Sequence, residues 1–162
     1  MLWGKEKTVE TQQHGMLDES QLSVFYPKIQ EFLNQVNQIV LDKNKQTQLA
    51  LCSLLAGGHI LFEDLPGLGK TTLASSLAHL AGLQFKRIQF TNDMLASDVI
   101  GVNMFNQKEH LFEFKQGPIF TQILLADEIN RCSPKTQSAL LEAMEEGVVT
   151  IDASRYILPQ PF

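Results

Sequence analysis

Apolar residues recur along the chain at two different spacings. Between residues 29 and 40 they fall at every third or fourth position, which is the spacing of one face of a helix. With Pro27 in its first turn, this pattern predicts a helix over 27–40. A polar break at 42–45 separates it from a second helix over about 45–56, which Gly57 and Gly58 end. The polar, Gln-rich start predicts a weakly ordered arm over 1–26 and a core domain over 27–162.

Beyond Gly58 short apolar runs alternate with helical patterns. Strands are predicted at 59–63, 85–90 and 122–126, and helices at 70–81, at 93–100, after Gly117-Pro118 and from Ser133-Pro134 to Gly147. Two β-hairpins are predicted, one pairing 102–105 with 111–114 and one pairing 148–151 with 156–158. Strands that alternate with helices indicate an α/β fold with a parallel sheet.

Composition narrows the class of protein. The 162 residues suffice for one domain, with 44% hydrophobic and 19% charged residues. A net charge of −5 does not indicate a broad basic face, so no nucleic-acid partner is expected. Cys52 and Cys132 have no metal-ligand spacing and are expected to be reduced thiols. No apolar run is long enough to span a membrane and the N-terminus does not resemble a signal peptide, so we expect a cytoplasmic protein.

The stretch 58–75, GHILFEDLPGLGKTTLAS, has the layout of a phosphate-binding P-loop between a strand and a helix. Gly69-Lys70-Thr71 fit the signature G-x-x-x-x-G-K-[ST], whereas Asp64 stands where the first Gly is usual. The alternative is a Gly-rich turn with an incidental Lys. The predicted nucleotide-binding residues are Asp64, Leu65, Pro66, Gly67, Leu68, Gly69, Lys70, Thr71 and Thr72.

Three side chains in this loop have distinct expected roles. Lys70 would reach the β- and γ-phosphates of ATP and so take part in catalysis. The Thr71 hydroxyl would coordinate Mg²⁺, and Thr72 would contact the α-phosphate.

A second stretch, ILLADEINR over 123–131, supplies two carboxylates. Leu124, Leu125 and Ala126 indicate a strand buried on both faces, and Asp127 and Glu128 follow at its C-terminal end, where parallel sheets bind ligands. Because neighbouring strand residues point to opposite faces, the two acids suit two tasks. Asp127 is expected to hold Mg²⁺, and Glu128 to polarise the attacking water. The alternative is a pair of solvated acids at a loop.

Three neighbouring residues keep two interpretations each. Arg131 either senses phosphate or a neighbouring subunit, or pairs with a nearby acid at the surface. Thr91 and Asn92 either hydrogen-bond Glu128 or form a polar strand end and helix cap, which is slightly favoured.

Five sequence blocks follow one another along the chain in this order: EDLPGLGKTTLA, RIQFTNDMLASDVIG, GPIF, LLADEINR and SPKTQSALLEAMEE. Together they closely resemble the MoxR family of AAA+ ATPases over about residues 39–162. Asp64 fits, because EDxPGxGKT is a common P-loop in that family. The departures, Asn92, Cys132 and Gly147, lie outside the catalytic set.

The resemblance implies a fold and an activity. The fold is a three-layer αβα P-loop NTPase with a parallel sheet and two small β-hairpin inserts. The activity is Mg²⁺-dependent ATP hydrolysis by a hexameric ring that acts as a chaperone on client proteins, including proteins with von Willebrand factor A domains. The alternatives are a nucleotide-dependent binding or assembly module without turnover, or a magnesium-chelatase-like AAA+ subunit.

The resemblance also implies an incomplete sheet. In the family, a sensor strand lies between the P-loop strand and the strand that bears Asp127 and Glu128, and it would begin at Phe162. The arginine finger and the helical lid follow it. We therefore expect that residues 59–63 either pair directly with 122–126 or that each segment keeps an unpaired edge. We also expect the 162-residue chain alone to bind nucleotide weakly and to hydrolyse it negligibly.

Overall fold

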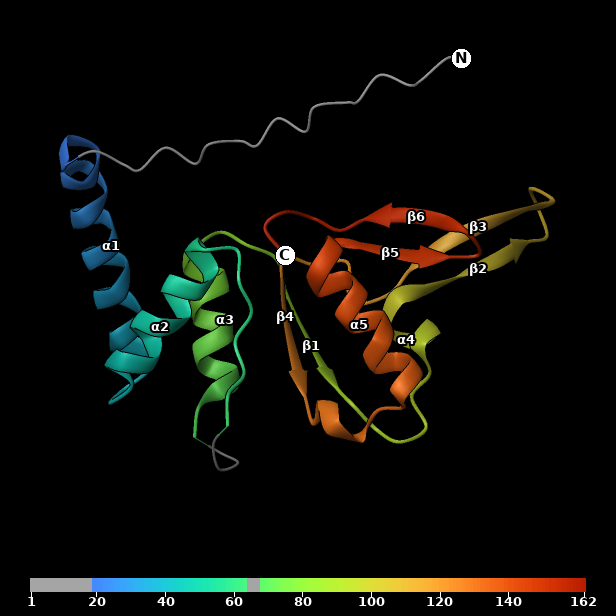
Figure 1. Cartoon of the computed structure of the whole chain (residues 1–162), viewed down its shortest axis with the longest axis horizontal. Helices are drawn as coiled ribbons and strands as arrows, with labels where there is room; N and C mark the ends of the chain where they lie inside the picture. The colour runs from blue at the N-terminus through green and yellow to red at the C-terminus, as the bar shows by residue number, and fades with distance from the viewer. Residues whose placement is uncertain (1–18, 64–67) are drawn as a thin grey trace, which may run out of the picture.

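The computed structural model describes residues 19–63 and 68–162, so the predicted arm at 1–18 and the loop positions 64–67 lie outside the described residues. A two-stranded parallel sheet, β1 (Phe85–Gln89) and β4 (Ile123–Asp127), stands between two groups of elements (Figure 1). One group is α1 (Glu19–Ile39), α2 (Asn44–Leu55) and α3 (Lys70–Leu80). The other contains α4 (Ala96–Ile100), the 3-10 turn η1 (Ile129–Arg131), α5 (Pro134–Glu146), and the hairpins β2 (Gly101–Asn106)–β3 (Leu111–Gln116) and β5 (Val148–Ile151)–β6 (Ser154–Ile157).

The parallel sheet confirms the predicted α/β class. β1 and β4 pair in a register that joins Phe85 to Ile123 and Gln89 to Asp127. Backbone bonds extend the pairing at both ends, from Ile123 N to the Gln84 oxygen and from Phe90 N to the Asp127 oxygen, each 2.9 Å long. In the described parts of the chain, β4 pairs with β1 alone.

The predicted strand at 59–63 is wrong as an element of a sheet. The segment is not a strand, and the hydrogen bonds described for it join side chains to carbonyls. His59 Nε2 hydrogen-bonds the Met144 carbonyl at 3.1 Å, and Lys70 Nζ donates to the Phe62 carbonyl at 3.4 Å. A strand requires a backbone partner as well as an apolar pattern, and none of the strands in the described parts of the chain pairs with this segment. Of the two expected arrangements, the structure has the one with unpaired edges.

Two further predictions need correction. The first helix begins at Glu19 instead of Pro27. The prediction missed its first turns because residues 22–28 are exposed, so the apolar residues among them follow no helical period. Pro27 lies within α1, which therefore crosses the predicted boundary at residue 26; the division into an arm and a core domain stays a prediction.

The short helix predicted after Gly117-Pro118 is a turn. Its backbone bonds go to α4 instead, from Gly117 N to the Ile100 oxygen and from Ile119 N to the Val99 oxygen. The approach is so close that a Cβ on Gly117 would lie 2.2 Å from the Val99 oxygen, so only glycine fits here.

Two hydrophobic clusters flank the sheet. The large cluster consists of Ile88, Phe90, Val99, Ile119, Phe120, Cys132, Leu140, Ala143, Val149, Ile151 and Leu158. The small cluster joins α1, α2 and α3 and consists of Val36, Val40, Ala50, Leu73 and Leu77. Both cysteines are free thiols, with Cys132 buried and Cys52 exposed.

The two predicted hairpins are confirmed, and they contact each other. The rings of Phe114 and Tyr156 lie 4.0 Å apart between centroids, and Asn103 Nδ2 donates to Asp152 Oδ2 at 2.8 Å. None of the helices within residues 19–63 and 68–162 combines the length and the apolar character that crossing a membrane requires.

Candidate functional site

The N-terminus of α3 is open toward a ligand. Gly69 precedes the helix with φ +80°, a left-handed conformation that favours glycine, and no side chain caps the helix there. Among residues 19–63 and 68–162, no atom lies within 4 Å of where a Cβ on Gly69 would stand. The first N–H groups of a helix have no intrahelical acceptor, so an uncapped end with free space above it suits an anion.

The remaining predicted loop residues take up different positions. Lys70 and Thr71 are half-buried in the first turn of α3, whereas Leu68 and Thr72 are exposed. The Thr72 carbonyl accepts a hydrogen bond from Ser75 Oγ at 3.2 Å. Asp64, Leu65, Pro66 and Gly67 lie outside the described residues.

The carboxylates leave β4 in different directions. Leu124 and Ala126 pack against the large cluster, so Leu125 and Asp127 lie on the other face of the strand, which α3 contacts. Glu128 follows with φ +57°, a conformation that costs a non-glycine residue about 1–2 kcal/mol. Such strain at an acidic residue beside a cavity is typical of functional sites.

One cavity of about 660 Å³ brings these groups together. Lys70, Asp127 and Glu128 line it, although Lys70 is distant in sequence from the two acids. Residues 57–62 form one wall and β4 forms the other. Lys70, from the first turn of α3, thus borders the same cavity as the two carboxylates at the end of β4, which is where α/β sheets place ligands.

The residues present fit a magnesium ion that is bound together with a polyphosphate. Asp127 offers a carboxylate and Thr71 a hydroxyl, both hard oxygen donors. Within the described parts of the chain, no three His, Cys, Asp or Glu residues cluster as a metal site. Mg²⁺ commonly takes one or two protein ligands and completes its shell with phosphate oxygens and water, so a sparse protein set is appropriate.

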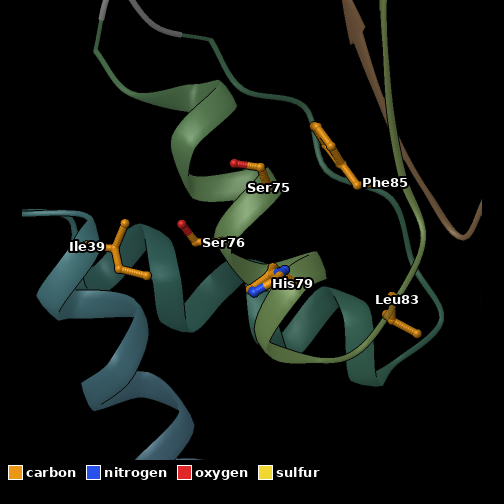
Figure 2. Close-up of a pocket in the computed structure, with 6 residues that line it drawn as sticks. All are labelled: Ile39, Ser75, Ser76, His79, Leu83 and Phe85. Atoms are coloured by element: carbon orange, nitrogen blue, oxygen red, sulfur yellow. The ribbon is translucent and has the colours of Figure 1, made fainter.

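A second cavity, of about 520 Å³, lies at the other end of α3 (Figure 2). Its polar side chains, Ser75, Ser76 and His79, all come from that helix, and Ile39 of α1 lies across from them. His79 is nine residues along the helix from Lys70, a rise of about 14 Å. The two cavities share no lining residue, so the second is no continuation of the first.

Glu128 pairs with Arg131. The Arg131 Nε lies 3.3 Å from Glu128 Oε2, with both side chains about half exposed, and the Arg131 N–H donates to the Glu128 carbonyl. This contact matches the second interpretation of Arg131, a surface pair with an acid.

Thr91 has a different partner from the one considered for catalysis. Its side chain hydrogen-bonds Asp93, and that bond, with a further one from the backbone of Asp93, lowers the pKa of the Asp93 carboxyl. The polar strand end is the interpretation that this contact favours.

Comparison with known proteins agrees with this geometry. The sequence profile of the "ATPase family associated with various cellular activities (AAA)" matches residues 59–162. The chain belongs to this AAA family. The match begins at the wall segment of the large cavity and includes every described residue predicted to contact nucleotide or metal.

Relatives of this AAA chain confirm the MoxR resemblance. It is 52% identical over 137 residues to the uncharacterized protein YeaC of Bacillus subtilis (strain 168), covering 85% of this chain and 43% of YeaC. It is 40% identical over 128 residues to the chaperone MoxR1 of Mycobacterium tuberculosis (strain ATCC 25618 / H37Rv), covering 79% of this chain and 34% of that protein.

A solved structure supports the AAA fold. It is a crystal structure from Cytophaga hutchinsonii ATCC 33406, described as a candidate ATPase, and it superimposes with a TM-score of 0.77 at 44% identity. The alignment covers 88% of this chain and 44% of that one. The chain thus spans less than half the length of these relatives.

One residue that contacts the candidate site was not predicted from the sequence. Arg87 on β1 donates from Nε to Asp127 Oδ2 at 2.6 Å. The signal was present in the alternation of FKRIQF, which puts Arg87 and Gln89 on one face. The partner could not be read from the sequence, because it depends on the register between β1 and β4.

Proposed function

We propose that this AAA chain carries the Mg·ATP site of a MoxR-type ATPase. The observation that supports it is the single cavity lined by Lys70, Asp127 and Glu128 beside the uncapped N-terminus of α3. Gly69 and the first turn of α3 offer backbone N–H groups to the phosphates, with Gly69 allowing close approach. The magnesium ion, when bound, neutralises charge on the phosphates.

The side chains then divide the work of phosphoryl transfer. Lys70 donates to the β- and γ-phosphate oxygens, and Thr71 and Asp127 hold the metal shell. Glu128, at the end of β4, orients the attacking water. Its present partner Arg131 must release it first, which costs little because both side chains are half exposed.

Nucleotide titration tests the site. A fluorescent ATP analogue is titrated into wild type, Lys70→Ala and Lys135→Ala. Lys70→Ala removes a charge-assisted contact to phosphate and should weaken binding by about tenfold or more. Lys135 is the matched control, because it also lies in the first turn of a helix but outside both cavities. Equal affinities for wild type and Lys70→Ala would remove Lys70 from the site.

Turnover separates an enzyme from a passive nucleotide-binding module. Residues 1–162 are fused to the part of YeaC that lies outside the aligned region, because the alignment covers only 43% of that relative. We expect this chimera to release phosphate and its Glu128→Gln form to bind ATP without releasing it. Tight ATP binding by the chimera without turnover would favour the module.

Assembly and clients complete the proposal. We propose a cytoplasmic homo-oligomeric ring that remodels client proteins, in line with the chaperone name of one relative. The β2–β3 hairpin is the proposed client-contacting surface, since Met104, Phe105, Leu111 and Phe112 are exposed on it. Light scattering of the chimera with ATP tests the ring, and a monomeric result would refute it.

A further inference from the structure

The Arg87–Asp127 contact follows from the register of the sheet. Arg87 pairs with Leu125 and Gln89 pairs with Asp127 across β1 and β4, so Arg87 lies one strand and two residues away from the carboxylate. Its Nε donates to Asp127 Oδ2 at 2.6 Å, and its Nη2 lies 3.4 Å from Gln89 Oε1. Gln89 thus helps to aim the guanidinium along the sheet toward Asp127.

The ion pair lies on the face of the sheet that the proposed metal site uses. Asp127 shares its face with Leu125, opposite to Leu124 and Ala126, which pack on the large cluster. Asp127 also lines the cavity with Lys70. A cation that approached Asp127 from α3 would therefore meet a carboxylate with one oxygen already engaged.

The charges determine what this contact does. The guanidinium of Arg87 places a positive charge beside the Asp127 carboxylate, so Asp127 has a counter-ion in the absence of metal. We propose that Arg87 is a positioning residue that competes with divalent cations for Asp127, so that the site retains a metal only when the metal arrives with a polyphosphate. This inference rests on the proposed function, because it takes Asp127 as part of the metal site.

The competition is easily reversed. The Arg87 side chain is 50% exposed and that of Asp127 22%, and ion pairs with one exposed partner are weak. The half-exposed guanidinium can turn toward solvent. The negative charge of a bound polyphosphate then favours the cation over Arg87 at Asp127, because a divalent ion is attracted by the phosphates as well as by the carboxylate.

Manganese binding without nucleotide tests the competition. Mn²⁺ is titrated into nucleotide-free protein, and free Mn²⁺ is measured by electron paramagnetic resonance. In Arg87→Met, loss of the positive charge should tighten Mn²⁺ binding about fivefold. Arg87→Gln should behave alike, whereas Arg87→Lys keeps the charge and should stay near wild type. Adding Asp127→Asn to Arg87→Met should abolish the gain.

Arg155→Met is the matched control, because Arg155 also forms an ion pair with one acid, Glu146, at an exposed position outside the cavity. It should leave Mn²⁺ affinity unchanged. Circular dichroism verifies that each variant is folded. Unchanged or weaker Mn²⁺ binding in folded Arg87→Met and Arg87→Gln would overturn the role of Arg87.

The nucleotide titration keeps the two proposals separate. If ATP affinity depends on Lys70 but Mn²⁺ affinity ignores Arg87, only the role of Arg87 is refuted. If ATP affinity is the same in wild type and Lys70→Ala, the proposed function is refuted, and the role of Arg87 in it falls as well.

Discussion

The large and small clusters lie on opposite faces of the same two strands, yet they are enclosed to different degrees. The large cluster is closed by α4, α5 and both hairpins, with Phe90, Val99 and Ile119 fully buried. The small cluster has fewer members, and its helices leave Leu49 and Leu55 59% and 67% exposed. The cavity with Lys70 borders both clusters, the small one at Ala50 and Leu77 and the large one at Leu140.

The helix N-termini of the two regions differ in the same way. α5 is preceded by Ser133, whose Oγ accepts from the Thr136 N–H at 3.3 Å, and Pro134 is its first residue. α3 is preceded by Gly69, and no described side chain caps it. A side chain of the protein thus caps the N-terminus of α5, whereas the N-terminus of α3 keeps backbone N–H donors for a ligand. Binding sites are commonly found in such less stable parts of a fold.

The largest expected effect is in the large cluster. Phe90→Ala empties a fully buried site and should lower the free energy of unfolding by about 3–5 kcal/mol. Urea denaturation followed by circular dichroism measures it. Phe112→Ala is the control, since that ring is 70% exposed and its loss should change stability by less than about 1 kcal/mol. Similar losses for the two variants would contradict the closed character of this cluster.

A smaller loss is expected in the small cluster. Leu77→Ala should cost about 2–3 kcal/mol, near the lower end for a buried leucine, because the adjoining cavity lets neighbours relax. Native-state hydrogen exchange should show faster exchange in α1–α3 than in α5. The exposed Leu141→Ala serves as control. If Leu77→Ala accelerates hydrogen exchange in α5 as much as in α1–α3, the two clusters unfold together.

Glycine substitutions separate strain from ligand binding at the two ends of α3. Gly69→Ala and Gly82→Ala each put an alanine at positive φ into open space, so each should cost about 1 kcal/mol. Only Gly69→Ala should also weaken ATP binding, by about tenfold, because Gly69 adjoins Lys70. Thermal unfolding and nucleotide titration measure the two effects. Equal ATP affinities for the pair would exclude a role for Gly69.

The smallest effect concerns the cap of α5. Ser133→Ala removes the acceptor for the Thr136 N–H and should lower the free energy of unfolding by about 1 kcal/mol. Ser138→Ala in the same helix is the control, because its hydroxyl only returns a bond to the Pro134 carbonyl. Urea titration of both variants checks this, and a Ser133→Ala variant as stable as wild type would show that water replaces the cap.

Local signals predicted part of this fold correctly. Ser133-Pro134 and Gly147 marked both ends of α5, and alternation of apolar residues marked both hairpins. Signals of this kind are encoded by neighbours in sequence: a cap, a fixed φ or a left-handed glycine acts within one turn. The start of α1 was not predicted because residues 22–28 are exposed and impose no helical period on the sequence.

The sequence alone also determined the family and the chemical groups of the candidate site, because a P-loop and a carboxylate pair are short contiguous motifs. The tertiary structure decided what those groups face. It left residues 59–63 without a strand partner and placed Arg87 on Asp127. Both outcomes depend on which strands lie side by side and in what register, and pairing between distant segments follows from packing that no local pattern encodes.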